Sequence, residues 1–213
     1  MAKWLVSRYL WGSILILIGV IFLIQNVFGY QVGALLWAVL LGLACAGFFY
    51  VYLGNREHWW ALIPGFTLLG VEIAILIDLL LPSLGGNISG AIVLGGIGLG
   101  FIAVYFTNRR NWWAIIPAGV MLTLMVVTGL EAILEGVAIG GVFMIGLGLT
   151  FALLAYTPTP EGNMRWALIP AGILIIIGLV VIAAAEAIFG YVIPLILILI
   201  GLVVIVRVFM GRK

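Results

Sequence analysis

The chain has 213 residues, of which 66% are hydrophobic and only 8% are charged. Because an ordinary soluble domain carries about 25% charged residues, this composition excludes a soluble globular fold and predicts an integral membrane protein. The net charge of +2, with dispersed basic residues, argues against nucleic-acid binding, and the single cysteine, Cys45, excludes an internal disulfide.

Eight apolar runs are long enough to cross a bilayer, since a transmembrane helix needs about 20 apolar residues. The predicted spans are 10–28, 32–53, 60–81, 88–106, 113–134, 137–156, 166–185 and 190–209. A lipid-exposed backbone must satisfy its own hydrogen bonds, so these spans are expected to be helices. We expect one all-α transmembrane domain over 1–213 without a soluble domain. No cleavage site follows the first run, so we expect a retained first helix rather than a signal peptide.

A pentapeptide, Trp-Ala-(Leu/Ile)-Ile-Pro, recurs at 60–64, 113–117 and 166–170, a constant spacing of 53 residues. A degenerate copy begins 53 residues earlier at Trp11, where the aliphatic run 14–18 and Gly19 align with 173–177 and Gly178. The pattern predicts four related two-helix units, approximately 1–54, 55–107, 108–160 and 161–213. Units with two spans enter the membrane in the same direction. They are therefore parallel repeats, unlike the inverted repeats of many ion-coupled carriers.

The basic residues predict the orientation of these spans. With eight spans, both termini and the loops after the second, fourth and sixth spans share one side. All nine Lys and Arg residues fall on that side: Lys3, Arg8, Arg56, Arg109, Arg110, Arg165, Arg207, Arg212 and Lys213. The positive-inside rule then places both termini in the cytoplasm, in an N-in/C-in orientation. The opposite side has acidic residues near its helix ends: Asp78, Glu131, Glu135 and Glu186.

Aromatic residues and prolines mark the cytoplasmic helix starts of the repeat. The aromatic residues are Trp59, Trp60, Trp112, Trp113 and Trp166. Indole rings prefer the headgroup region, so we interpret them as interfacial anchors rather than as an aromatic ligand cage. The repeat prolines are Pro64, Pro117 and Pro170. Because proline suits a first helical turn, we expect regular helix to begin near Ile63, Ile116 and Ile169, or a bend there.

Glycines within the spans predict close helix packing. The run Gly95-Gly96-Ile97-Gly98-Leu99-Gly100 superficially resembles a dinucleotide-binding loop, but it lies inside an apolar span. Small residues four apart let membrane helices approach closely. We expect this role for Gly96 with Gly100, for Gly42 with Ala46, and for Gly140, Gly141, Gly146 and Gly148.

Glu72 is the ionisable residue deepest in a predicted span. A charge at that depth costs at least ~2.5–3.5 kcal/mol, so the side chain is expected to face the bundle interior. The aligned positions hold Gly19, Met125 and Gly178, so the repeat fold does not require the acid. Two interpretations remain open. Glu72 is either a proton or cation site or a polar contact with a partner helix, or it is a neutral acid hydrogen-bonded to a hydroxyl or carbonyl group.

A second aligned position holds Gln25, Asp78, Glu131 and Ala184 near the non-cytoplasmic helix ends. If the units close into a ring, Asp78 and Glu131 would line an acidic mouth that concentrates cations. The simpler interpretation, which we favour, is that polar residues mark the end of the helix. His58 has no Cys or His partner, so we expect no metal site and no cofactor. No nucleophile–base set can be assembled, which argues against an enzyme.

The helix starts resemble the transmembrane region of bacterial LiaI/LiaF-type envelope-stress proteins. The resemblance rests on the repeated pentapeptide with its following aliphatic run, and on Leu10-Trp11 with 15–20. The soluble C-terminal domain of the LiaF type has no counterpart in this sequence. The resemblance implies a multi-pass protein of the bacterial cytoplasmic membrane that acts through contacts with other membrane proteins.

These observations favour a non-enzymatic scaffold, accessory or sensor-associated subunit in the membrane. The alternative is a channel or carrier for protons or small cations, with Glu72 at mid-depth and Asp78 and Glu131 at the outer mouth.

Overall fold

The computed structural model describes residues 2–28, 30–133, 139–159, 162, 164–184 and 198. Within these ranges the regular structure is helical. Outside the helices, Thr159 and Gly162 form an isolated antiparallel β-bridge. The α-helices are α1 (Ala2–Phe28), α2 (Tyr30–Gly54), α3 (Leu62–Leu80), α4 (Pro82–Thr107), α5 (Ile115–Ile133), α6 (Ile139–Tyr156) and α7 (Leu168–Ala184). Three 3-10 helices precede α3, α5 and α7: η1 (Trp59–Ala61), η2 (Arg109–Ala114) and η3 (Arg165–Ala167).

Six helical segments in the described residues are long and apolar enough to cross a membrane. They are Val32–Gly54, Trp59–Leu80, Ile88–Thr107, Arg109–Glu131, Ile139–Tyr156 and Arg165–Ala184. They coincide with the second to seventh predicted spans, so the prediction of an all-helical chain with several potential membrane helices is confirmed for this part. The first predicted span lies within α1, whose apolar stretch is the shorter Trp11–Val27. The eighth, 190–209, lies outside the described residues except for Ile198, as do Glu135, Glu186, Arg207, Arg212 and Lys213.

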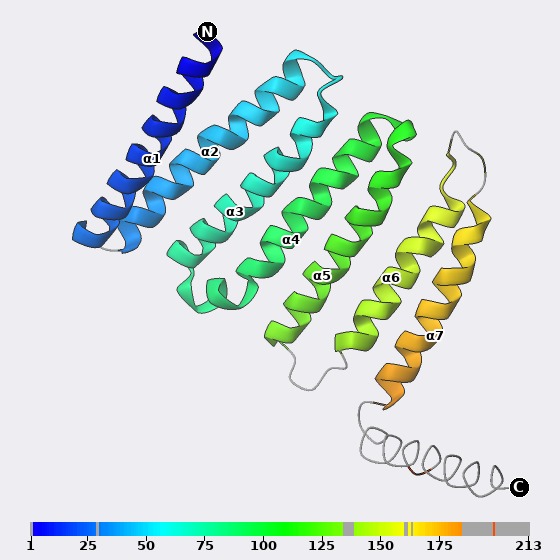
Figure 1. Ribbon diagram of the computed structural model, residues 1–213. Coiled ribbons are helices and arrows are strands. Elements are labelled where there is room, and N and C mark those ends of the chain that lie inside the picture. The colour runs from blue at the N-terminus through cyan, green and yellow to red at the C-terminus, as the bar shows by residue number, and fades with distance from the viewer. Residues whose placement is uncertain are drawn as a thin grey trace, which may run out of the picture.

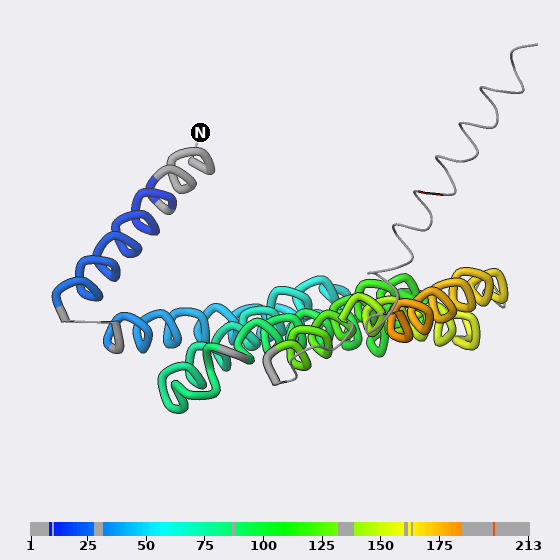
Figure 2. Tube along the Cα trace, turned by 90° about the horizontal axis from the view of Figure 1, so that it is seen from below, coloured from blue at the N-terminus to red at the C-terminus, as the bar shows by residue number. Residues whose placement is uncertain are grey.

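The seven helices lie side by side in a single layer, in chain order from α1 to α7 (Figure 1). Viewed edge-on, α2 to α7 form one thin layer, and α1 is tilted out of its plane (Figure 2). Each helix packs mainly against its neighbours in sequence, and α1 and α7 lie at opposite edges. The row is therefore open over the described residues, and the ring on which the predicted acidic mouth depends is not formed by these helices.

Successive helices alternate in direction, so the start of α1 and the α2–α3, α4–α5 and α6–α7 connections lie at one end of the layer (Figure 1). We call this the arginine end, because its connections carry Arg56, Arg109, Arg110 and Arg165. The core cluster of buried residues also lies at this end. Its members are Leu62, Val104, Tyr105, Ala114, Ile115, Leu154, Ala155 and Ala167.

One backbone conformation recurs before α3, α5 and α7. His58 (φ −80°, ψ 44°), Asn111 (φ −84°, ψ 37°) and Met164 (φ −83°, ψ 44°) have nearly the same dihedral angles. They stand 53 residues apart, each shortly before the first residue of an α-helix. The alanines that end the three 3-10 helices, Ala61, Ala114 and Ala167, are all fully buried, with 0% exposure. The alanine of the repeated pentapeptide is therefore a packing position where a larger side chain would have to displace its neighbours.

The repeat prolines fall at the third residue of α3, α5 and α7. These helices begin at Leu62, Ile115 and Leu168, one residue before the predicted starts. The first four backbone N–H groups of a helix have no partner within it, so proline at this position removes little.

Close glycine packing is confirmed at several predicted positions and wrong at two. A Cβ on Gly96 of α4 would lie 2.9 Å from the Cα atom of Gly70 in α3, and one on Gly100 would lie 3.2 Å from Cα of Ile63. By contrast, a Cβ on Gly140 would meet nothing within 4 Å. Ala46 is exposed, because it points out of the layer while Cys45 is buried between α2 and α3.

Candidate functional site

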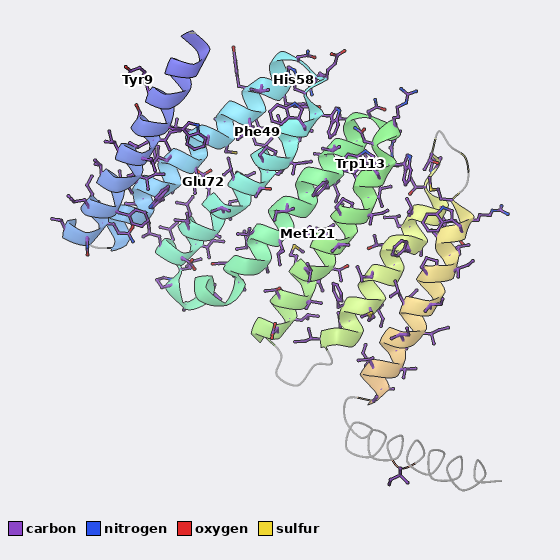
Figure 3. The ribbon with its side chains drawn as sticks, in the orientation of Figure 1. Tyr9, Phe49, His58, Glu72, Trp113 and Met121 are labelled. Carbon is purple, nitrogen blue, oxygen red and sulfur yellow. The ribbon has the colours of Figure 1, made fainter. Side chains whose placement is uncertain are left out.

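Glu72 lies about halfway along α3 and directs its carboxyl group at α2 (Figure 3). A Cβ built on Gly42 of α2 would be 2.7 Å from Oε1 and 3.3 Å from Oε2 of Glu72. The carboxyl group thus occupies the space that a side chain at position 42 would fill. On the same face of α2, the Cys45 thiol donates a hydrogen bond to the carbonyl oxygen of Gly65, with a sulfur–oxygen distance of 3.3 Å. Glu72 therefore lies in the contact between α2 and α3.

The environment of this carboxyl group is apolar and only partly closed. Glu72 is half-buried, and its neighbour Ile73 is 39% exposed. No hydrogen bond within the described part of the chain reaches the carboxyl group. Nor do the described residues contain a cluster of three or more His, Cys, Asp or Glu side chains that could hold a metal ion. Glu72 was predicted to face a bundle interior. It lies instead at the margin of the α2–α3 contact, where its carboxyl group is partly exposed.

The same contact recurs in the next unit with a different residue. A Cβ on Gly95 of α4 would lie 2.7 Å from the sulfur atom of Met125 in α5. Gly42 and Gly95 are 53 residues apart, as are Glu72 and Met125. The uncharged thioether of Met125 therefore packs against Gly95 as the carboxyl group of Glu72 packs against Gly42. The fold supports the prediction that this position does not need an acid.

The third such contact differs because glycine replaces the long side chain. A Cβ on Gly178 of α7 would be 2.7 Å from the carbonyl oxygen of Gly141 in α6. Gly148, the counterpart of Gly42, instead faces Ile175 and the carbonyl oxygen of Ala171, which would lie 2.9 Å from its Cβ. With no side chain at 178, the backbones of α6 and α7 approach closely, and no acid-bearing contact is repeated there.

Asp78 lies near the end of α3, opposite the first turns of α4. The Ser89 hydroxyl group is 2.8 Å from Asp78 Oδ1, and its second partner is the Gly85 carbonyl oxygen at 2.6 Å. Because α4 begins at Pro82, the carboxylate lies close to a helix N-terminus, where the helix dipole favours negative charge. Asp78 thus tethers the α3–α4 hairpin locally, which favours the simpler interpretation that it marks a helix end.

The other aligned positions do not join Asp78 in a common site. Glu131 is exposed near the end of α5, and α4 lies between α3 and α5. The aliphatic carbons of Gln25 in α1 pack against Gly33 of α2, and Ala184 is 7% exposed. The structure therefore does not bring Asp78 and Glu131 together within one chain.

The predicted anchor tryptophans gather at the arginine end as aromatic pairs. The rings of Trp59 and Trp113 have centroids 5.8 Å apart in an edge-to-face arrangement, and Trp60 meets Phe48 in the same way at 6.3 Å. Trp60, Trp113 and Trp166 are more exposed than Trp59 and Trp112. Pairing at the layer edge fits interfacial anchoring better than an enclosed aromatic cage. His58 is exposed, with its ring 6.4 Å from that of Trp60.

Two arginine–tyrosine pairs at this end were missed by the sequence interpretation. The Arg56 guanidinium carbon lies 4.7 Å from the ring centroid of Tyr52, and that of Arg109 lies 4.5 Å from Tyr105 and 5.2 Å from Phe106. Both pairs follow the pattern Tyr-x-x-x-Arg at a spacing of 53 residues. Four residues is about one helical turn, so this pattern was a detectable signal.

Each pair stands beside an apolar groove on the layer. The groove near Tyr52 lies among α2, α3 and α4, with a volume of about 500 Å³, and the groove near Tyr105 lies among α4, α5 and α6, with about 370 Å³. Five lining residues of the first have repeat counterparts in the second. The counterparts are Phe49 and Ile102, Tyr52 and Tyr105, Leu53 and Phe106, Leu62 and Ile115, and Phe66 and Gly119.

Comparison with known proteins adds no family assignment. No protein-family model, curated protein or solved structure matches this chain.

Proposed function

We propose that this chain is a non-enzymatic multi-pass membrane protein that acts as a scaffold, accessory or sensor-associated subunit through contacts inside the membrane. The observation that carries the proposal is the single layer of helices. In this layer, which Figure 2 shows edge-on, large apolar side chains stay exposed along several helices, as Leu43, Leu99, Leu149 and Ile176 illustrate. A layer one helix thick gives an unusually large area for other membrane helices relative to its length.

Glu72 gives this surface a polar contact point. Its carboxyl group is half-buried, apolar in its surroundings and without a hydrogen-bond partner among the described residues. A carboxyl group in such a place gains from a donor or cation supplied by a partner helix. This favours the interpretation of Glu72 as a polar contact with a partner over that of a self-satisfied neutral acid.

The membrane topology in this proposal has eight spans as four parallel two-helix units, with both termini in the cytoplasm of a bacterial cell. It is supported by the six long apolar helices, the apolar run 190–209 and the arginines gathered at one end. The resemblance to LiaI/LiaF-type transmembrane regions supports the same localisation. Labelling of Arg110→Cys with a membrane-impermeant thiol reagent, in a Cys45→Ala background, tests the orientation. Labelling of intact cells from outside would contradict it.

Mild-detergent purification from native membranes tests the scaffold proposal. We expect another membrane protein in a fixed ratio, reduced at least about tenfold by Glu72→Leu if a hydrogen bond to the carboxylate is lost. Glu131→Gln is the matched control, because Glu131 is exposed at a helix end, and it should leave the ratio unchanged. Robust catalysis or transport by the purified chain alone would contradict the proposal.

The alternative is a channel or carrier for protons or small cations that uses Glu72. It is favoured by the partial exposure of this carboxyl group at mid-helix. Since the row of described helices is open, conduction would need additional copies or segments to complete a path. Flux of protons or potassium ions into liposomes that contain the purified chain, abolished by Glu72→Gln and retained by Glu57→Gln in the exposed α2–α3 connection, would support this alternative.

A further inference from the structure

An apolar groove that includes an arginine in its lining lies at the arginine end of the layer. It lies among α4, α5 and α6 and has a volume of about 370 Å³. This falls in the range of about 300–1,000 Å³ typical of small-molecule sites. Its lining is mostly apolar and includes Ile102, Leu122 and Leu153, of which Leu153 is 62% exposed. A groove of this kind can take an acyl chain side-on from the surrounding bilayer.

A cation stands at the end of this groove. Arg109 is a lining residue, and its guanidinium group lies over the rings of Tyr105 and Phe106. Stacking on aromatic rings holds the plane of an arginine but leaves its N–H donors at the edge, where they can bind a phosphate through two parallel hydrogen bonds. Trp112 and Trp113, in η2 directly before α5, indicate that this end lies at headgroup depth.

The arrangement occurs twice in the chain. Arg56 lies over Tyr52 beside the groove among α2, α3 and α4, in the repeat-equivalent position. There Phe66 stands in place of Gly119, and its ring packs against Phe49 with centroids 5.3 Å apart. The following unit has Pro158 and Gly162 where Tyr105 and Arg109 stand, so it lacks both elements.

We propose that the groove among α4, α5 and α6 binds one phospholipid with an anionic headgroup. Arg109 contacts the phosphate, and one acyl chain lies along Ile102, Leu122 and Leu153. Charge complementarity selects the anionic class. The Arg109 guanidinium group would repel the ammonium group of a zwitterionic headgroup, and basic residues near a membrane surface attract anionic lipids. The groove near Tyr52 is a second, weaker site of the same class, because Arg109 lines the first groove whereas Arg56 does not line the second.

Native mass spectrometry of the full-length chain in detergent tests this proposal. The probes are phosphatidylglycerol and phosphatidylcholine with identical acyl chains. We expect phosphatidylglycerol to bind at least about tenfold more tightly, with one strong and one weaker site per chain. Arg109→Ala should reduce the affinity of the strong site at least about tenfold, the fold-change expected when a hydrogen bond to a charged group is lost. Arg109→Lys should retain part of it, because lysine keeps the charge but not the paired donors.

Matched variants separate charge from shape. Arg110→Ala removes an adjacent exposed charge outside the groove and should change the affinity less than about threefold. Leu153→Trp fills the groove without changing charge and should weaken binding. Ile176→Trp, at an exposed position of α7 that lines none of the described grooves, should not. Retention time on gel filtration and helix content by circular dichroism report whether each variant is folded.

Several results would overturn the assignment. Equal binding of the two lipids, or undiminished phosphatidylglycerol binding in both Arg109→Ala and Leu153→Trp, would exclude an anionic lipid at this groove. Inorganic phosphate, tested without lipid, distinguishes the other source of the same chemistry. Retention of phosphate by the wild-type chain and its loss in Arg109→Ala, without a lipid preference, would assign the cation to a free anion instead.

Discussion

Glu72 of α3 holds a carboxylate oxygen 2.7 Å from the point where a side chain on Gly42 of α2 would begin. The two residues come from helices that contact each other along one face of α2, where Cys45 is also buried. The carboxyl group thus occupies the space that the absence of a side chain at position 42 leaves free. The glycine and the acid form one structural unit, and each has a testable effect on the other.

Gly42→Ala is expected to destabilise the α2–α3 contact, because its Cβ would overlap the Glu72 carboxyl group. Overpacking costs about 1–3 kcal/mol, and the penalty here should be about 1 kcal/mol because the end of the Glu72 side chain can move aside. In a double-mutant cycle with Glu72→Ala, this penalty should largely disappear, giving a coupling free energy of at least about 0.5 kcal/mol. The measurement is the free energy of unfolding in detergent micelles, by thermal or SDS titration.

Gly47→Ala is the matched control for this cycle, since a Cβ at Gly47 would meet nothing within 4 Å. It should be neutral or slightly stabilising, because alanine is the better helix former. Additive effects of Gly42→Ala and Glu72→Ala would contradict the described contact.

Glu72→Met is expected to raise stability while removing the proposed polar contact. Met125 already packs against Gly95 in the equivalent place, so methionine fits this geometry. Removing an acid from mid-span should stabilise the chain by about 1–3 kcal/mol, given the ~2.5–3.5 kcal/mol insertion penalty of such groups. Unfolding in micelles measures the gain, and lower stability than wild type would show that the acid is structural.

The fold class and most helix positions were predictable from local composition. Apolar runs of membrane length are set by the sequence itself, so the second to seventh predicted spans coincide with α2–α7. The helix starts were predicted to one residue from Pro64, Pro117 and Pro170, because proline is restricted to the first turn. The 3-10 helices before α3, α5 and α7 recur at the same spacing of about 53 residues as the pentapeptide.

The lateral arrangement was not predictable in the same way. Apolar helices have no polar face in a bilayer, so hydropathy does not say which side of each helix meets a neighbour. For this reason the prediction placed Ala46 in a helix–helix contact, although Cys45 is the residue buried there. It also placed Gly140 in a contact, although a Cβ on Gly140 would meet nothing within 4 Å. The open single layer also followed from no sequence pattern, and the Arg109–Tyr105 pair was overlooked among interfacial residues.

Ala114→Leu is expected to destabilise the arginine end. Ala114 is fully buried in the core cluster beneath the turn that precedes α5. Three added carbon atoms would force neighbouring side chains to move, at a cost of about 1–3 kcal/mol. Ala46→Leu is the control, because Ala46 is exposed on α2 and the added carbons would meet lipid or detergent. Equal unfolding midpoints for the two variants would contradict the burial described for the pentapeptide alanine.

The α5–α6 contact contains two reciprocal glycine–threonine pairs. Thr150 of α6 faces Gly119 of α5, with its Cβ 2.7 Å from the point of a Cβ at 119, and Thr123 faces Gly146 in the opposite sense. The Thr150 hydroxyl donates to the Gly146 carbonyl oxygen at 2.9 Å, so no polar partner on α5 is needed. Gly119→Ala should therefore destabilise by about 1–3 kcal/mol through overlap alone.

Thr150→Gly should rescue Gly119→Ala, because it removes the Cβ that the new alanine would strike. Thr150→Gly alone is expected to cost about 1 kcal/mol for glycine in a helix interior. The double variant should then be more stable than the sum of the two single effects by at least about 1 kcal/mol. Gly129→Ala on the same helix is the control, since its nearest atom would be Ala91 Cβ at the ordinary distance of 3.9 Å. Absence of rescue with an unchanged control would mean that α5 and α6 do not interlock through these residues.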